Sequence, residues 1–232
     1  PMILLDGKAL SEKIKEEVKV EVAQLVEEKQ ITPGLAVILV GNDAASATYV
    51  ASKAKSCKNA GIYSVVHEMP ESITQEELLE TIARMNENPK LDGILVQLPL
   101  PKHIDTTVVL EAIDPLKDVD GFHPYNVGRM VSNLDAFLPA TPFGVMRMFQ
   151  EYGIELSGKN VVVIGSSDIV GKPMASLLIN AKATVTVCNS RTKDLASHTK
   201  AADIVVIAVG VPYLLKADMV KDGAIVIDVG IN

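Results

Sequence analysis

Tyr49 and Lys53 form the first pair of side chains whose types and spacing fit a chemical role. They lie four positions apart in a segment that the sequence predicts to be helical, so both project from one face of that helix. An ammonium group beside a phenol in a closed cleft can stabilise an anion that develops during a reaction. A surface pair without a role is the alternative. A Tyr-x-x-x-Lys pair also occurs in short-chain dehydrogenases, but there it follows the nucleotide-binding strand, whereas here it precedes it.

Two further polar residues are candidates for the same pocket. Gln97 is an amide near the end of the otherwise apolar strand predicted at residues 92–98, and it needs a hydrogen-bond partner if it is buried. Asp120 lies between Val119 and Gly121 in a long loop. It serves either as an ordinary turn aspartate or as an acceptor for the N–H groups of a ligand.

A second candidate site begins at the end of a predicted buried strand, Asn160–Ile164, which is apolar and β-branched. Gly165 ends this strand and Gly171 opens a helix, with Ser166 and Ser167 between them. Backbone N–H groups and the positive end of a helix can face a phosphate at such a turn. The spacing differs from the usual G-x-G-x-x-G, so a plain strand-to-helix turn is the alternative.

The next predicted strand, residues 184–187, favours a particular nucleotide. NAD sites carry an acidic residue about twenty positions after the first glycine, where it holds the ribose hydroxyls. Here the strand runs into Cys188-Asn189-Ser190-Arg191 instead, with no carboxylate. A hydroxyl next to a guanidinium suits a ribose phosphate, so NADP is favoured over NAD.

The remaining elements predict two α/β lobes. Strands at residues 204–207 and 224–229 end at Gly210 and Gly230, which completes a doubly wound, Rossmann-like parallel sheet. The first half is a separate βαβαβ unit preceded by a helix, with helices at 8–29, 45–60 and 74–88 and strands at 35–40, 62–68 and 92–98. Gly61 is expected to close the second of these helices, and Thr74 with Glu77 forms a capping box for the third.

The turn-rich segment 114–141 is expected to be either functional or a domain boundary. Thr141 is expected to be the N-cap of a helix that reaches about Tyr152, with Pro142 at its first position. The predicted domains are therefore residues 1–140 and 141–232, with a cleft between them that receives the ligands.

Composition limits the remaining possibilities. The 232 residues carry a net charge of −7 and no basic block, which argues against a nucleic-acid partner. Cys57 and Cys188 are far apart, which predicts reduced thiols and a cytoplasmic location. The four histidines show no metal-ligand spacing, there is no G-x-S-x-G nucleophile motif, and no apolar run reaches the length of a membrane span. These observations reach a two-lobed NADP oxidoreductase without naming its substrate.

Several motifs resemble the bifunctional methylene-tetrahydrofolate dehydrogenase/cyclohydrolase (FolD) family. The segments that carry the resemblance are Y-V-A-S-K-A-K-S-C at 49–57, D-G-I-L-V-Q-L-P-L-P at 92–101, D-V-D-G-F at 118–122, P-A-T-P at 139–142, I-V-G-K-P at 169–173 and the closing strand at 224–232. The resemblance implies NADP-dependent oxidation of methylene-tetrahydrofolate to the methenyl cation, its hydrolysis to formyl-tetrahydrofolate, a role in one-carbon metabolism, and a homodimer.

The resemblance also implies residue roles. Lys53 would be the catalytic lysine, hydrogen-bonded to Gln97 and helping to activate water or to handle its proton. Tyr49 would stack on the folate ring, and Asp120 would hold the pterin N–H and amino groups. Leu98 and Pro99 complete the expected folate site. The expected nucleotide contacts are Thr141, Gly165, Ser166, Ser167, Ile169, Gly171, Ser190, Arg191, Gly210 and Ile231, and no metal is expected.

Three features depart from the family pattern. Ser166 replaces the arginine of a frequent G-R-S, which removes one candidate phosphate ligand and leaves that task to Arg191. Asn189 replaces the histidine of C-H-S, with Ser190 kept. The family continues beyond residue 232 with a proline- and glycine-rich loop that borders the folate and with a final helix. We therefore expect the sequence to be a truncated piece of the family's chain.

Two other functions are compatible with the lobes alone. One is another two-lobed NAD(P) dehydrogenase of the amino-acid-dehydrogenase type, which would lack the Tyr49, Lys53 and Gln97 trio. The other is a regulator that binds the nucleotide without turnover.

Overall fold

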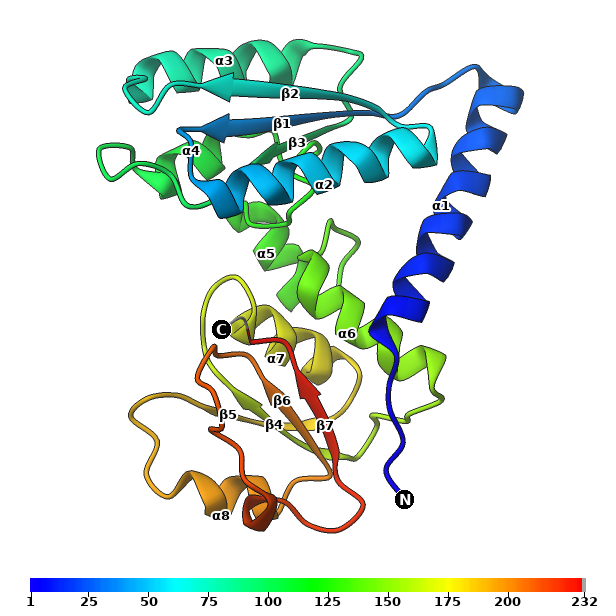
Figure 1. The fold of residues 1–232 in the computed structure, drawn as a ribbon, viewed down its shortest axis with the longest axis vertical. Coiled ribbons are helices and arrows are strands. Elements are labelled where there is room, and N and C mark those ends of the chain that lie inside the picture. The colour runs from blue at the N-terminus through cyan, green and yellow to red at the C-terminus, as the bar shows by residue number, and fades with distance from the viewer. Residues whose placement is uncertain (231–232) are drawn as a thin grey trace. The chain divides into compact units, whose positions relative to one another are not determined.

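The computed structural model describes residues 1–230 and divides the chain into two compact units. The first unit is Asp6–Asn126, and the second unit is Val127–Asn232 together with Pro1–Leu5. Each unit is built on its own parallel sheet with helices on its faces (Figure 1). The predicted α/β class and the Rossmann-like second unit are confirmed.

The first unit has a three-stranded parallel sheet in the order β2-β1-β3. Its elements in chain order are α1 (Gly7–Lys29), β1 (Gly34–Val40), α2 (Ala44–Ala60), β2 (Tyr63–Met69), α3 (Gln75–Glu87), β3 (Gly93–Val96) and α4 (Thr106–Ala112). The central strand β1 pairs with both neighbours, and Ile38 lies opposite Val96. The carboxyl ends of β1 and β3 therefore reach the same edge of the sheet.

Strand β1 is apolar throughout because both of its faces are covered. Ala36 and Ile38 pack with the apolar residues of α3 and α4 on one face. Val37 and Leu39 point the other way and pack with Val50 of α2. Helix α2 is thus held against the sheet by its buried stripe, and the face with Tyr49 and Lys53 is fixed with it.

The predicted helix ends of the first unit are confirmed. Gly61 closes α2 in a left-handed conformation with φ of 81°. The Thr74 side chain accepts from the Glu77 backbone while the Glu77 side chain accepts from the Thr74 backbone, which forms the expected capping box of α3.

The second unit has a four-stranded parallel sheet in the order β5-β4-β6-β7. Helix α5 (Pro124–Val131) crosses the division between the units, and the elements that follow are α6 (Ala140–Glu151), β4 (Asn160–Ile164), α7 (Gly171–Asn180), β5 (Thr184–Cys188), α8 (Leu195–Lys200), β6 (Ile204–Ile207), the 3₁₀ helix η1 (Ala217–Met219) and β7 (Ile225–Asp228). The chain passes from β4 to β5 on one side and then to β6 on the other. This reversal of strand order is where doubly wound folds bind their ligands.

The faces of this sheet are also defined by strand alternation. Val161 and Val163 of β4 pack with apolar residues of α6 and α7. Val162 and Ile164 pack on the opposite face with Leu195 of α8 and with the loop that follows β6. Strand β4 coincides with the segment that the apolar run predicts.

Three local expectations were wrong. Helix α6 begins earlier than predicted, because the Phe143 amide donates to the Pro139 carbonyl at 3.1 Å, so Pro139 and not Thr141 is the N-cap. The segment 114–141 contains helix α5, and α4 precedes that segment. Both are too short to show a clear period in the sequence. Strand β3 ends at Val96, before the predicted end at Leu98, although the Gln97 amide still donates to the Ile38 carbonyl of β1.

The division between the units falls before the predicted boundary at residues 140 and 141. Asn180 of α7 donates its side-chain amide to the Met130 carbonyl at 2.8 Å. The end of α5 is thereby tied to the second unit, together with the segment that leads into α6.

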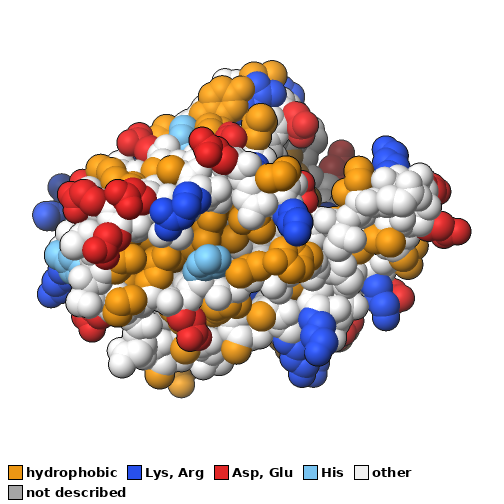
Figure 2. Space-filling view, turned by 90° about the horizontal axis from the view of Figure 1, so that it is seen from above, with side chains coloured by type: hydrophobic (Ala, Val, Ile, Leu, Met, Phe, Trp, Pro, Cys, Tyr) orange, Lys and Arg blue, Asp and Glu red, His pale blue; other side chains and the backbone are white. Residues whose placement is uncertain are grey.

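The surface mixes charges of both signs with apolar side chains. On the face drawn in Figure 2, basic side chains are interspersed with acidic and apolar ones. None of the helices described in residues 1–230 combines the length and the apolar character needed to cross a bilayer.

The turn between β4 and α7 provides a stability test. A Cβ at residue 171 would lie 2.1 Å from the Gly165 carbonyl oxygen, which is backbone and cannot rotate away. Gly171→Ala should therefore lower the free energy of unfolding by about 1–3 kcal/mol. Gly144 in α6 has nothing within 4 Å of its Cβ position, so Gly144→Ala should raise that free energy by about 0.5–1 kcal/mol. Urea unfolding measures both, and equal effects of the two variants would contradict the close approach.

Candidate active site

The centre of the first unit's site is a hydrogen bond between Lys53 and Gln97. The Lys53 Nζ donates to the Gln97 Oε1 at 2.7 Å, and both side chains are half-buried. The Gln97 backbone amide donates to the Ile38 carbonyl at 2.9 Å, and its side-chain Nε2 donates to the Leu98 carbonyl at 3.3 Å. Gln97 is therefore held from both ends, and it fixes the ammonium group at the carboxyl edge of the sheet.

Helix α2 determines where Lys53 starts. The Asp43 carboxylate caps this helix by accepting from the Ser46 amide at 2.8 Å. The hydrogen bonds from Ser46 hold the pKa of Asp43 below its usual value. Tyr49 lies one turn before Lys53 on the same face and leaves 48% of its surface exposed, so its ring is available to a planar ligand.

Asp120 reaches the same region from a different segment. The Ile94 amide of β3 donates to the Lys117 carbonyl at 2.7 Å, and Ile94 forms a parallel bridge with Asp118, so the segment 117–120 runs beside β3. Gly93 allows this approach, because a Cβ there would lie 2.5 Å from the Val119 Cγ1.

The charge of Asp120 is strongly affected by its surroundings. Burial raises the pKa of Asp120 to about 6, while the positive charge of Lys53 lowers it and the negative charge of Asp118 raises it. None of the donors described in residues 1–230 forms a hydrogen bond to this carboxylate. A half-buried carboxylate without a donor is suited to accept N–H groups from a ligand.

The structure thus brings together the residues that the sequence analysis placed in one pocket. Tyr49, Lys53, Gln97 and Asp120 gather at the carboxyl edge of the first sheet, with Leu98 half-buried and Pro99 exposed directly after Gln97. The arrangement offers a flat ring, a fixed cation and an acceptor, which together can hold a planar ligand rich in N–H groups and move a proton beside it.

The second unit's turn leaves no space for side chains at its glycines. Gly165 has φ of 117°, in the left-handed region, and a Cβ there would lie 2.9 Å from the Ala208 carbonyl oxygen. The Ser167 Oγ accepts from the Val170 amide at 3.2 Å and from the Gly171 amide at 3.4 Å. The turn therefore presents backbone and a small hydroxyl at the start of a ten-residue helix, which fits a nucleotide phosphate.

The end of β5 lies directly beside this turn. The Gly165 amide donates to the Cys188 carbonyl at 2.7 Å. Beyond Cys188 the chain is held in a tight turn, since the Asn189 amide donates to the Thr192 Oγ1 at 2.8 Å and the Arg191 amide donates to the Asn189 Oδ1 at 2.9 Å. The side chains of Ser190 and Arg191 remain exposed next to the glycine turn.

The other expected nucleotide contacts are distributed over the second unit. In the glycine turn, Ser166 is half-buried and Ile169 is 47% exposed. Gly210 is exposed in the loop after β6. Ala208, which directly follows β6, lies against Gly165. Thr141 is exposed in the first turn of α6. Ile231 lies outside the described residues.

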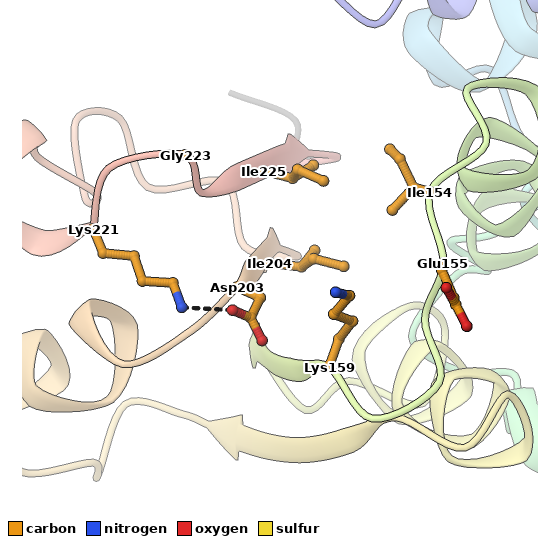
Figure 3. A pocket seen from close by; sticks show the side chains of 8 residues that line it. All are labelled: Ile154, Glu155, Lys159, Asp203, Ile204, Lys221, Gly223 and Ile225. Atoms are coloured by element: carbon orange, nitrogen blue, oxygen red, sulfur yellow. Dashed lines mark hydrogen bonds and ion pairs between the residues drawn. The ribbon is translucent and has the colours of Figure 1, made fainter.

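A pocket of about 290 Å³ lies at the opposite end of the second sheet (Figure 3). It is lined by Lys159, which precedes β4, by Asp203, which precedes β6, and by Ile225, the first residue of β7. Asp203 accepts from Lys221, which lowers the pKa of Asp203. Parallel α/β sheets bind ligands at the carboxyl ends of their strands, so this pocket at the amino ends is not the candidate site.

Among residues 1–230, no group of three or more His, Cys, Asp or Glu side chains is placed to hold a metal ion. Cys57 and Cys188 are free and buried, and burial raises the pKa of both thiols.

Comparison with known protein families decides the assignment. Residues 5–120 match the catalytic domain of tetrahydrofolate dehydrogenase/cyclohydrolase, and residues 139–232 match the NAD(P)-binding domain of the same proteins. The chain belongs to the tetrahydrofolate dehydrogenase/cyclohydrolase family. The resemblance of its motifs to that family is therefore confirmed.

Individual members of the family are similar over the whole chain. The chain is 91% identical to the bifunctional protein FolD of Aliarcobacter butzleri, over the full chain and 80% of that protein. It superposes on the FolD crystal structure from Campylobacter jejuni with a TM-score of 0.98 at 55% identity, covering all of this chain and 82% of that one. The Trypanosoma brucei enzyme, solved with NADP cofactor and an inhibitor, has a TM-score of 0.94 at 41% identity, covering 98% and 78% of the two chains.

Sequence reasoning missed one part of this site. Asp118 and Asn126 are buried at 2% and 4% exposure beside the segment that carries Asp120. The signal that could have found Asp118 is the pair of aspartates in D-V-D-G at 118–121. One aspartate is enough for an ordinary turn, so the second one indicates a further role.

Asp120 should make the folded protein less stable at neutral pH. Its folded-state pKa of about 6 exceeds the ordinary value of 3.8. The unfolded chain therefore loses this proton at lower pH than the folded protein does. The resulting destabilisation is absent below the ordinary pKa, grows as the pH rises to about 6, and is complete above it. Asp120→Asn should therefore raise the free energy of unfolding at pH 7.5 by about 1–3 kcal/mol, with a smaller gain at pH 5. Urea unfolding at both pH values measures this, with the exposed Glu71→Gln as the control. A gain independent of pH would contradict the assigned pKa.

Proposed function

We propose that the chain catalyses two successive reactions on tetrahydrofolate derivatives. The first is the NADP-dependent oxidation of methylene-tetrahydrofolate to methenyl-tetrahydrofolate, and the second is the hydrolysis of that product to formyl-tetrahydrofolate. The observation that carries the proposal is the Lys53–Gln97 hydrogen bond beside Asp120, in a chain of this family. An amino-acid dehydrogenase does not account for the family match, and a nucleotide-binding regulator does not account for the fixed lysine.

Binding of the folate is assigned to three groups of the first unit. The Asp120 carboxylate accepts the N–H and amino hydrogens of the pterin, for which it has free acceptor positions. The exposed ring of Tyr49 stacks on the flat folate ring. Leu98 and Pro99 line the site next to Gln97. These contacts hold the reacting carbon in place without touching it.

The oxidation step requires positioning more than acid or base catalysis. The carbon that loses hydride lies between two nitrogens, so the cation that forms is stabilised by resonance. A bound NADP⁺ would supply the acceptor for this hydride. Gln97 keeps Lys53 oriented during this step.

The hydrolysis step is where Lys53 acts. Water attacks the methenyl carbon and must lose a proton before a carbon–nitrogen bond of the ring can open. Lys53, held 2.7 Å from Gln97, is the group of the site that can handle this proton. The released product is formyl-tetrahydrofolate.

The second unit is proposed to bind NADP. The glycine turn and the Ser167 hydroxyl receive the pyrophosphate at the start of α7. Ser190 and Arg191, on the adjoining turn, receive the ribose phosphate. Thr141, Ser166, Ile169, Gly210 and Ile231 are proposed as further contacts. The domain limits at residues 1–140 and 141–232 remain part of the proposal.

The proposed cellular setting is a homodimer in the cytoplasm, without nucleic acid or membrane as a partner. The homodimer rests on the family resemblance, and sedimentation measures it. The cytoplasmic location is supported by two buried free thiols, which suit a reducing compartment.

The function is tested by following the absorbance of methenyl-tetrahydrofolate with each nucleotide. The wild-type chain should form it from methylene-tetrahydrofolate with NADP and then consume it. A chain that binds NADP but forms no methenyl product would be a regulator instead.

Lys53→Met should abolish hydrolysis of added methenyl-tetrahydrofolate and leave NADP affinity nearly unchanged, because the lysine belongs to the first unit and the nucleotide residues belong to the second. Lys58→Met, on the same helix but exposed, is the matched control and should hydrolyse normally. Normal hydrolysis by Lys53→Met would remove the lysine from the mechanism.

Arg191→Ala should weaken NADP binding and leave NAD binding nearly unchanged, since NAD has no phosphate at that place. A charge-assisted contact contributes about 1.5–3 kcal/mol, which corresponds to roughly one to two decades in affinity. The measurement is the ratio of kcat/KM with the two nucleotides, and the exposed Lys200→Ala of α8 is the control. A parent that prefers NAD, or a variant that loses both nucleotides equally, would show that the phosphate site lies elsewhere.

A further inference from the structure

A buried carboxylate outside the folate contacts organises the loop that carries Asp120. The Asp118 Oδ2 accepts from the Asn126 Nδ2 at 3.0 Å and from the His123 backbone amide at 2.9 Å. The same Asn126 nitrogen donates to the Pro115 carbonyl at 2.9 Å. One carboxylate and one amide thus tie together both sides of the loop around Asp120.

The position of this carboxylate is fixed against the sheet. Asp118 forms a parallel bridge with Ile94, and the segment runs in the direction of β3. Two residues beyond Ile94 the strand ends, directly before Gln97, and two residues beyond Asp118 the segment reaches Asp120. The bridge at Asp118 therefore fixes the register of this segment beside β3, and with it the position of Asp120 at the carboxyl end of the sheet.

The charge of Asp118 is not needed for these hydrogen bonds. Its donors are neutral groups, an amide side chain and a backbone N–H, and an asparagine oxygen in its place could accept from both. Like charges disfavour each other's ionisation, and the charges that act on Asp120 from the described residues are Lys53 on α2 and Asp118 on its own loop. An aspartate here therefore does more than shape the loop.

We infer that Asp118 is a positioning residue for the proposed folate site: its hydrogen bonds from Asn126 and from the His123 amide hold the loop that places the Asp120 carboxylate, and its own charge acts on that carboxylate. This inference rests on the proposed function for its substrate. It concerns a residue that touches neither folate nor nucleotide in the proposed mechanism.

Two substitutions separate placement from charge. Asp118→Asn keeps an acceptor for Asn126 and removes the negative charge. It should leave the folate KM at pH 7.5 within about twofold of wild type, and it should move the acidic rise of that KM to lower pH by roughly 0.5–1 unit. Asp118→Ala removes the shared acceptor of the His123 amide and of Asn126, so that only the Asn126 bond to the Pro115 carbonyl remains. It should raise the folate KM roughly tenfold or more with little change in kcat. Asp114→Asn is the control, since it removes a carboxylate of the same loop that does not act on Asp120.

A direct titration makes the inference independent of turnover. Carboxyl carbon NMR, with the Asp120 signal assigned through Asp120→Asn, should show a lower pKa for Asp120 in Asp118→Asn than in wild type or in Asp114→Asn. An unchanged pKa together with an unchanged acidic limb of the folate KM would overturn the inference, whether or not Asp118→Ala folds. A wild-type chain that forms no methenyl product would instead overturn the proposed function, and the titration would still report on the Asp118–Asp120 pair.

Discussion

The hydrogen bond from the Gln97 amide to the Ile38 carbonyl determines the geometry of the first unit's site. It extends the ladder between β1 and β3 by one residue beyond Val96, where the strand itself ends. The backbone of Gln97 is therefore positioned by sheet pairing, while its side chain lies beyond the end of the strand and accepts from Lys53. Because α2 packs on the same strand through Val50, the distance from Gln97 to Lys53 follows from the packing of two regular elements.

The second unit uses the same geometry for a different ligand. The Gly165 amide bonds to the Cys188 carbonyl and the Ala208 amide bonds to the Ile164 carbonyl, so each neighbour of β4 is locked at the point where β4 ends. The loops after three strands are thus held at one edge by backbone pairing. Their side chains are left for recognition, which suits a site whose main demand is close approach of backbone to phosphate.

The sequence predicted most strongly where one physical signal dominates. The apolar run at Asn160–Ile164 and the capping box at Thr74 were found in the structure because burial and capping act locally. Helix α5 and the start of α6 were not, since their ends depend on backbone hydrogen bonds such as Phe143 to Pro139. The role of Asp118 was invisible for a similar reason, because its partner Asn126 is brought to it by the folded loop.

The half-buried Asp120 shows why the site could be predicted from the sequence while the pKa of its carboxylate could not. Its residue type suggested an acceptor, yet the raised pKa comes mainly from burial in the folded unit, which the sequence does not show. A carboxylate that destabilises the free protein gains favourable donors when a ligand binds, so the first unit gains stability on binding.

The two helices that follow the central strands begin differently, and this difference separates the two ligands. In the first unit the carboxylate of Asp43 occupies the positive end of α2. In the second unit the neutral hydroxyl of Ser167 covers the start of α7. An incoming phosphate would be repelled at the first helix and accepted at the second. The nucleotide phosphate is therefore directed to the second unit, because the Asp43 carboxylate already neutralises the positive end of α2 in the first.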